Sequence, residues 1–280
     1  MVKKATGKAS KTGKAETGLT VPGKAGALAK KGMATDAPDY IKTGAAGRGL
    51  ENVCREDLVI PRVKLLQPMS PEVQDKGMKE GHLINNLSQK DYGDTLEFIP
   101  ITHTKSRIYW QDREDGGGML CASDNGLDRR DHDAPAKIAK LLKIKDFVLP
   151  ADCSCCPFHG WDNEAEREKD QKPKCTIYYN FPAFVNGEMV ALSLDRTKIR
   201  TAKNILTLAT TTGGNADMFA KKYRLTVTKE KNDQYSYYNI VVEPAGWVSE
   251  EEYEAGKAMY DSFKNKTLKV EQDAPQQEQR

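Results

Sequence analysis

Between positions 81 and 110 the hydrophobic residues fall in short runs that polar clusters interrupt. Apolar and β-branched residues dominate 82–85, 96–101 and 107–110, while Gly, Asn, Asp and Ser fill the intervals. This alternation is typical of antiparallel strands joined by turns. The pattern predicts that the folded part of the chain begins with short β-strands and that the glycine run at 116–118 ends them.

A longer hairpin and a helix are predicted in the second half of the chain. Residues 175–185 alternate between apolar and polar positions, and the segment 189–194 returns after Asn186-Gly187. An Asn-Gly pair between two such runs is a strong hairpin signal. Residues 197–211 then repeat apolar side chains at helical spacing, which predicts one helix with a single face toward the core.

The remaining elements are a closing hairpin and two further helices. Residues 223–228 and 235–242 alternate strictly around a predicted turn at Asn232-Asp233. Ser249 and Glu252 stand at capping-box spacing and predict a helix that ends near Phe263. Residues 134–144 form a short amphipathic helix, with Asp133 as its predicted N-cap and a proline in its first turn.

Strands, one helix and a final hairpin make up the element order of an OB-fold. We therefore predict a mainly β (α+β) protein with a five-stranded OB-type barrel over 49–248, whose exposed face in this fold binds oligonucleotides. An insertion at about 111–174 interrupts the barrel. A C-terminal helix is predicted over 249–270, and the Gln-rich 271–280 and the Lys/Gly/Ala/Thr-rich 1–48 are predicted to be disordered.

Charge is distributed unevenly along the chain. Residues 1–48 hold ten lysines or arginines and three acidic residues, a net charge of +7, whereas 49–248 come to −1 and 249–280 to −3. A basic arm on a nearly neutral body favours an anionic polymer as partner, although it is also compatible with a solvating tail. No apolar run follows the basic start, so we expect no secretory signal, no membrane partner and a reducing cytoplasm.

Five of the six cysteines lie between Cys121 and Cys175, and three of these are packed into four positions. Cys153 and Cys156 have the Cys-x2-Cys spacing that presents two thiolates to one tetrahedral zinc ion. Cys175 is the predicted third ligand. Cys121 is favoured as the fourth over His159, which leaves Cys155 outside the site. The alternative is a set of buried cysteines or disulfide partners, which a reducing compartment disfavours.

Aromatic and basic residues supply the candidate nucleic-acid contacts. Exposed rings on a sheet stack with bases while neighbouring cations hold phosphates. The alternative for each ring is a place in the core. In the last hairpin, Tyr235 and Tyr237 are predicted to face away from the core, and basic residues crowd the start of the 197–211 helix. The candidate contacts are Arg107, Tyr109, Trp110, Arg113, Tyr178, Arg196, Lys198, Arg200, Lys203, Arg224, Tyr235 and Tyr237.

Cys121-Ala-Ser-Asp, the Cys153-x2-Cys156 knuckle, Pro173-Lys-Cys175 and the segment 192–203 follow one another in a distinctive order. This order resembles bacteriophage single-stranded DNA-binding proteins of the OB-fold type that carry a zinc-ribbon insertion. The resemblance covers roughly 80–245. It implies a structural zinc ion and single-stranded DNA as partner. Many such proteins recruit replication proteins through an acidic C-terminal tail, whereas the tail here is only mildly acidic.

The leading hypothesis is a non-enzymatic protein that coats single-stranded DNA during phage replication or recombination. The first alternative is a metal-dependent nuclease or nucleic-acid-modifying enzyme, for which the acidic clusters at 112–115 and 128–133 are the candidate residues. No hydrolase elbow, P-loop or His-Glu-x-x-His motif accompanies them. The second alternative is a structural or scaffold protein that uses zinc only for its shape.

Overall fold

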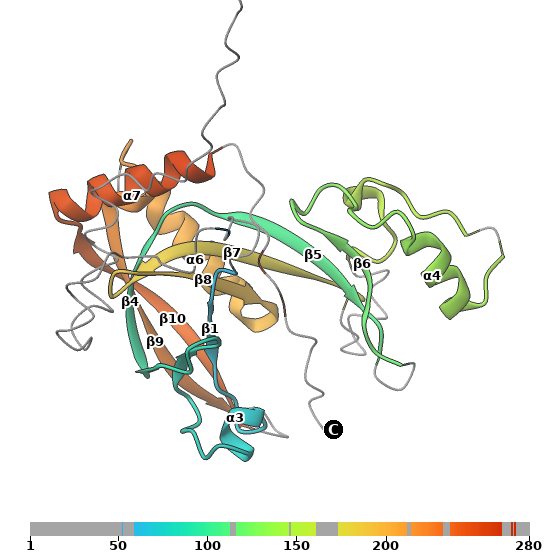
Figure 1. The fold of residues 1–280 in the computed structure, drawn as a ribbon, viewed down its shortest axis with the longest axis horizontal. Coiled ribbons are helices and arrows are strands. Elements are labelled where there is room, and N and C mark those ends of the chain that lie inside the picture. Colours follow the sequence, from blue (N-terminus) through green and yellow to red (C-terminus); the bar gives the residue numbers. More distant parts are fainter. Residues whose placement is uncertain are drawn as a thin grey trace, which may run out of the picture.

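Strands dominate the protein, as the sequence predicts. The computed structural model describes residues 52, 59–112, 116–145, 147–160, 173–211, 214–231, 236–264, 270 and 272. Within these residues, ten strands join in one mixed sheet (Figure 1). The strands are β1 (Arg62–Leu65), β2 (Leu83–Asn85), β3 (Asp91–Gly93), β4 (Thr95–Pro100), β5 (Thr104–Trp110), β6 (Met119–Ser123), β7 (Cys175–Val185), β8 (Glu188–Asp195), β9 (Lys221–Lys231) and β10 (Ser236–Trp247).

The helical elements are few and short. The α-helices are α3 (Pro71–Gln74), α4 (Ala134–Leu142), α6 (Ile199–Thr211) and α7 (Glu250–Phe263), and the 3₁₀ turns are η3 (Cys153–Cys155), η4 (Arg196–Lys198) and η5 (Met218–Ala220). No helix among the described residues is long and apolar enough to cross a membrane.

The sheet is not the closed five-stranded barrel that the sequence predicts. Its strand order is β10-β9-β4-β7-β8-β1-β2-β3, with β5 and β6 branching from β7. The far edge of β8 pairs in parallel with β1, which in turn carries β2 and β3. The N-terminal strands therefore occupy the edge of β8 that would have to pair with the last hairpin to close a barrel.

Side chains rather than a ladder connect β10 to the N-terminal strands. The Gln67 side chain accepts from the Tyr238 backbone N–H at 2.9 Å and donates to the Tyr238 carbonyl at 2.7 Å. Gly81 lies beside the same residue. A Cβ at Gly81 would come within 2.6 Å of the Tyr238 ring, and its backbone has a φ of +78°. The contact between these two segments thus involves Gln67 and Gly81, and Glu80 adds to it by accepting from the Tyr238 hydroxyl at 2.8 Å.

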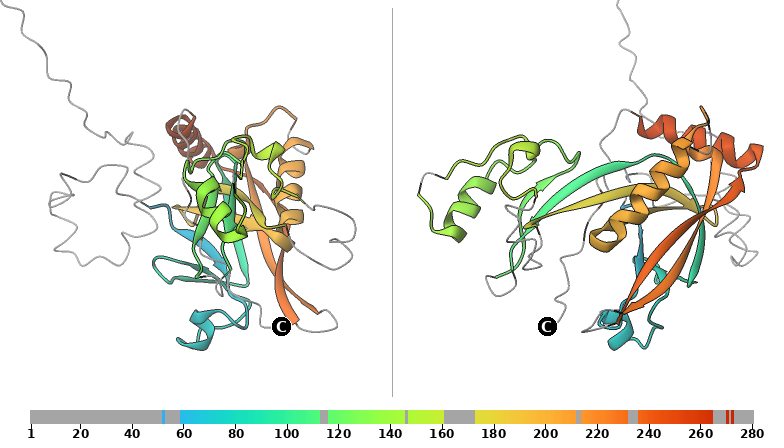
Figure 2. Two further views of the ribbon diagram at one scale, coloured as in Figure 1. Left: turned by 90° about the vertical axis from the view of Figure 1, so that its right-hand side faces the viewer. Right: turned by 180° about the vertical axis from the view of Figure 1, so that it is seen from behind.

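The main core lies between the strands and helix α6. Ile205 and Ala202 of α6 are fully buried and pack with residues such as Phe98, Phe181 and Tyr223 from β4, β7 and β9. Seen from behind, α6 lies across β7 and β8 (Figure 2). The helical spacing predicted for 197–211 is confirmed, because the apolar face of α6 packs against this core.

Local sequence signals are confirmed at two further places. Asn186 and Gly187 both have positive φ, 50° and 80°, as the two-residue turn between β7 and β8 requires. Helix α7 begins with the predicted capping box, in which Ser249 and Glu252 satisfy each other's backbone N–H groups. Asp133 stands at the N-cap position of α4, but its side chain makes no capping hydrogen bond.

The inserted segment forms a lobe at the far end of β5 and β7. Figure 1 shows these two strands extending away from the body and ending beside β6 and α4. The lobe has a small core of its own, in which the buried residues are Tyr109, Leu120, Ala134, Ile138, Leu149 and Phe158. So small a core supplies little hydrophobic stabilisation for an independent unit.

Candidate metal centre and nucleic-acid interface

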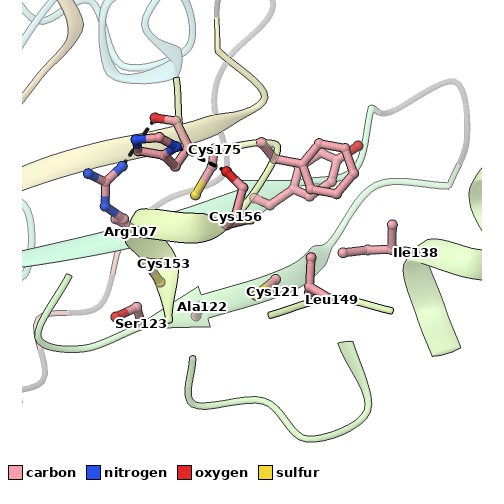
Figure 3. A pocket seen from close by; sticks show the side chains of 12 residues that line it. Arg107, Cys121, Ala122, Ser123, Ile138, Leu149, Cys153, Cys156 and Cys175 are labelled. Atoms are coloured by element: carbon pink, nitrogen blue, oxygen red, sulfur yellow. Dashed lines mark hydrogen bonds between the residues drawn. The ribbon is translucent and has the colours of Figure 1, made fainter. Parts of the chain in front are cut away.

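The structure brings together the four cysteines that the sequence selects as metal ligands. Cys121, Cys153, Cys156 and Cys175 line a single cavity of about 20 Å³ in the inserted lobe (Figure 3). A cavity of this size has room for about one guest the size of a water molecule or an ion. Cys155 is exposed and does not line it. These five cysteines are free thiols, so disulfides do not account for their proximity.

Strand register positions two of the thiols. Tyr109 on β5 lies directly opposite Cys121 on β6 and also directly opposite Cys175 on β7. Residues directly opposite each other in neighbouring strands project from the same face. Cys121 and Cys175 therefore project on the same side of the sheet, one on each side of Tyr109.

A short turn positions the other two thiols. In η3 the Asp152 carboxylate accepts from the Ser154 N–H at 2.7 Å, and the Cys156 N–H donates to the Cys153 carbonyl. The turn is held against the lobe by backbone hydrogen bonds, from the Cys153 N–H to the Leu127 carbonyl at 2.7 Å and from the Cys175 N–H to the Phe158 carbonyl at 3.0 Å. Two strands and one turn thus converge on the cavity.

Burial favours the protonated form of three of these thiols. It raises the pKa of Cys121 to about 11 and that of Cys175 to about 12, and it also raises the pKa of Cys156. Within the described part of the chain, no group of three or more His, Cys, Asp or Glu side chains is arranged so that it could hold a metal ion. The donor types nevertheless fit zinc, because four thiolates make a closed structural site once a cation offsets their charge.

His159, the alternative ligand, also lines the cavity. Its Nδ1 lies 3.0 Å from the Cys156 carbonyl, and its own carbonyl accepts from Arg107 at 3.3 Å. Arg107 also donates to the Gly126 carbonyl. This arginine, selected from the sequence as a phosphate contact, thus links β5 to the cysteine lobe.

The predicted rings separate into two groups. Tyr109 is only 6% exposed and packs against Phe158 in the core of the lobe, with ring centroids 5.0 Å apart, so its ring is not available for base stacking. Trp110 and Tyr178 instead meet on the other face of the sheet, where the Trp110 Nε1–H donates to the Tyr178 hydroxyl at 3.1 Å. Tyr178 is only 5% exposed, so its ring is no more available for stacking than that of Tyr109, whereas Trp110 is half-buried.

Two arginines act on the Tyr178 hydroxyl. The pKa of Tyr178 is raised, mainly by burial and also by the Asp195 carboxylate. The hydrogen bond from Trp110 and the guanidinium groups of Arg196 and Arg62 act in the opposite direction and lower this pKa. Both cations are therefore close enough to influence this side chain. Arg62, on β1, was not among the residues selected from the sequence.

The other basic candidates differ in their surroundings. Arg196, Arg200 and Lys203 are exposed near the start of α6, as predicted, whereas Lys198 pairs with Asp195 at 2.9 Å. Arg224 is bound by two carboxylates, Glu97 at 2.7 Å and Glu243 at 3.0 Å. Both acidic partners already offset its charge, which makes Arg224 a poor phosphate contact.

The last hairpin is described only in part. Tyr237 is half-buried, and its hydroxyl donates to Glu230 at 2.6 Å, on the face opposite the core residue Ile240. Tyr235 and Arg113 lie outside the described residues, as do the predicted turn at 232–233 and the basic arm 1–48.

Sequence reasoning missed a polar group at the centre of the Trp110–Tyr178 face. Asn180, two positions along β7 from Tyr178, is only 1% exposed and hydrogen-bonds Ser106 and Ser193 from the two neighbouring strands. The sequence does carry a sign of this polar group, because an asparagine within the otherwise apolar run 177–185 is unusual for a buried strand.

Comparison with protein families identifies the family of this chain. The family model described as "Pam3 phage gp34-like protein" matches residues 29–269. No curated protein and no solved structure matches the chain significantly.

Proposed function

The chain belongs to the Pam3 phage gp34-like protein family, and on that premise we propose that it is a single-stranded DNA-binding protein of a phage. It coats exposed strand during DNA replication or recombination and catalyses no reaction. Its setting is the cytoplasm of the infected host cell, where replication or recombination proteins are its proposed protein partners.

The observation that carries this proposal is the Trp110–Tyr178 pair on one face of the sheet with two arginines near it. A single strand is bound without sequence preference when aromatic rings stack with its bases and cations hold its phosphates. Trp110 supplies the ring, which the buried Tyr178 holds through a hydrogen bond, and Arg62 and Arg196 supply the cations. Arg200 and Lys203 are exposed on α6, which packs on the opposite face of the sheet, so they do not extend this surface.

The arrangement of strands supports an open OB-type topology as the framework. The continuous segment β4–β5 pairs with β9 at one end and with β7 at the other, β7 pairs with β8, and α6 lies between β8 and β9 in the chain. In an OB-fold the middle strands and their loops carry the oligonucleotide. Here these strands are β5, β7 and β8, which present the Trp110–Tyr178 face.

A structural zinc ion in the inserted lobe is the second part of the proposal. Cys121, Cys153, Cys156 and Cys175 would hold it, and the ion would supply the charge that keeps four buried thiolates together. Its contribution is to stabilise a lobe with little apolar core. Because the lobe sits at the ends of β5 and β7, an ordered lobe also fixes the position of Trp110, the last residue of β5.

The proposal is tested by replacing Trp110 with alanine and measuring binding of a fluorescein-labelled oligo(dT) by anisotropy. Loss of one stacking partner should weaken binding by about 1–3 kcal/mol. Trp247→Ala is the matched control, because Trp247 is 63% exposed at the other end of the protein, where it contacts Lys221 beside α7. The control should retain the affinity of the unmodified protein.

Thermal melting of both variants separates binding from folding. If Trp110→Ala melts at the same temperature as Trp247→Ala and still binds oligo(dT) with undiminished affinity, this face is not the binding surface.

A further inference from the structure

A residue near the C-terminus occupies the centre of the Trp110–Tyr178 face. The Gln272 Nε2 group donates to the Asn180 Oδ1 at 3.1 Å and to the Ser193 Oγ at 3.0 Å, and it lies 3.5 Å from the Val270 carbonyl. The Gln272 Oε1 accepts from the Arg62 guanidinium at 3.2 Å. Both ends of one carboxamide are thus bound by residues from β7, β8 and β1.

The polar pocket around this carboxamide is built from buried side chains. Asn180 is only 1% exposed, and its Nδ2 donates to Ser106 at 2.9 Å while its Oδ1 also accepts from Ser193 at 2.7 Å. Thr104 lies directly opposite Asn180 on β5. Its buried hydroxyl has no hydrogen-bond partner within the described part of the chain. Such a group in a native structure calls for a partner.

We propose that this pocket, formed by Asn180, Ser193, Thr104 and Arg62, is a subsite for a nucleobase, and that Gln272 occupies it as an internal substitute. The inference rests on the proposed function, because it assigns one base-binding position within the proposed strand-binding face.

The chemical reason is the shared hydrogen-bonding pattern of carboxamides and bases. A glutamine side chain offers a carbonyl acceptor beside an NH₂ donor. Each nucleobase also offers an acceptor beside a donor on its Watson–Crick edge, and proteins read single strands through this edge. The Arg62 guanidinium is the donor for the acceptor group, and Asn180 Oδ1 with Ser193 Oγ are the acceptors for the donor group.

The neighbourhood of the pocket supports a base rather than another amide compound. Tyr178 is two positions from Asn180 on β7, so both side chains project from the same face of the sheet. Trp110 is hydrogen-bonded to Tyr178 on that face. A base with its edge in the pocket would lie on the same face as the half-buried Trp110 ring, and stacking on such rings is the main source of affinity in sequence-tolerant binding.

Gln272 and a base cannot fill the pocket together, so DNA must first displace the glutamine. Apparent affinity falls in proportion to the fraction of molecules whose pocket is open. If Gln272 fills the pocket in about nine molecules of ten, removing it tightens DNA binding about tenfold. Gln272 then limits binding to strands that can compete with it.

The test compares the full chain with its Gln272→Ala variant in anisotropy titrations with oligo(dT). Gln272→Ala should tighten binding by about tenfold. The matched control is Gln74→Ala, because Gln74 is exposed on α3 and donates to the Pro68 carbonyl; its affinity should stay the same. Adding Ser193→Ala to Gln272→Ala removes one pocket hydrogen bond and should weaken binding about three- to tenfold relative to Gln272→Ala alone.

A second measurement follows the glutamine itself. In ¹⁵N spectra of the full chain, the side-chain amide signal that Gln272→Ala removes should shift to its solvent-exposed position when oligo(dT) is added. An abasic oligomer of the same length, which has phosphates but no bases, should leave that signal unchanged. Displacement by both oligomers would overturn the inference, because phosphate would then be the competing group.

The outcomes distinguish this inference from the proposed function. If the protein binds oligo(dT) but Gln272→Ala changes affinity by less than about twofold, the pocket is not a base subsite although the protein still binds DNA. If no variant binds oligo(dT), the proposed function fails and the inference fails with it.

Discussion

Replacing Cys175 by serine removes one of the four thiols that converge on the cavity of the inserted lobe. Cys175 is the first residue of β7, and its backbone N–H is bound to the Phe158 carbonyl, so the substitution changes one ligand atom at a fixed position. Serine is nearly isosteric with cysteine but is not a zinc ligand of structural sites. The fold of the lobe should therefore respond to the loss of metal rather than to a change of volume.

The expected loss of zinc affinity follows from the number of ligands. Structural zinc sites contribute about 10–16 kcal/mol at neutral pH. Shared among four thiolates, this is about 2.5–4 kcal/mol for each, which corresponds to about a fiftyfold to a thousandfold loss of affinity. We expect about one zinc ion per chain in the unmodified protein and almost none in Cys175→Ser after dialysis against a moderate chelator.

The assay combines elemental analysis with limited trypsin digestion. Lys140 and Lys143 lie at the end of α4, which packs on the lobe through Ile138, so a loosened lobe should be cleaved there sooner. Cys155→Ser is the matched control, because Cys155 is exposed beside the cavity, and it should retain metal and resist digestion. The reasoning is refuted if Cys175→Ser keeps its zinc, or if the unmodified protein purified without chelator holds no metal.

Three further changes have defined outcomes. Gly81→Ala should lower the free energy of unfolding by about 1–3 kcal/mol in chemical denaturation, because the backbone φ at Gly81 is +78° and the new Cβ would meet the Tyr238 ring. Unchanged stability would mean that the segments holding Gly81 and Tyr238 are not in contact. Arg224→Ala should leave oligo(dT) affinity unchanged, since two carboxylates already bind this arginine, and a large loss would place it in the interface. Deleting residues 1–48 should leave melting unchanged and make log affinity less dependent on log salt concentration; an identical slope would exclude phosphate contacts by the arm.

Elements whose signals are local in the sequence could be predicted. The Asn186-Gly187 turn and the capping box at Ser249 are each fixed within four residues, and both are confirmed. Strand β1 was missed, because its pairing partners on β8 lie about 130 positions away and four residues carry little periodicity. The closed barrel was wrong for the same reason, since β1 occupies the edge of β8 that a closing strand would need.

The candidate sites also divide into those with local sequence signals, which could be predicted, and those that depend on distant residues, which could not. Cysteine spacing was enough to select four residues that do line one cavity, because thiols have few roles at such spacing. The polar pocket could not be predicted, because Gln272 is 92 positions from Asn180 and 210 from Arg62. Single polar residues on separate strands carry no spacing rule, and only the register of β5, β7 and β8 brings them together.

The most direct test of the central claim is an equilibrium titration of labelled oligo(dT) with the purified full chain, with and without magnesium, followed by electrophoresis of the DNA. The account predicts saturable binding that weakens with salt, the same affinity with and without magnesium, and an oligonucleotide of unchanged length. Failure to bind at low salt, or shortened DNA in the presence of magnesium, would contradict the claim that this protein is a non-enzymatic single-stranded DNA-binding protein.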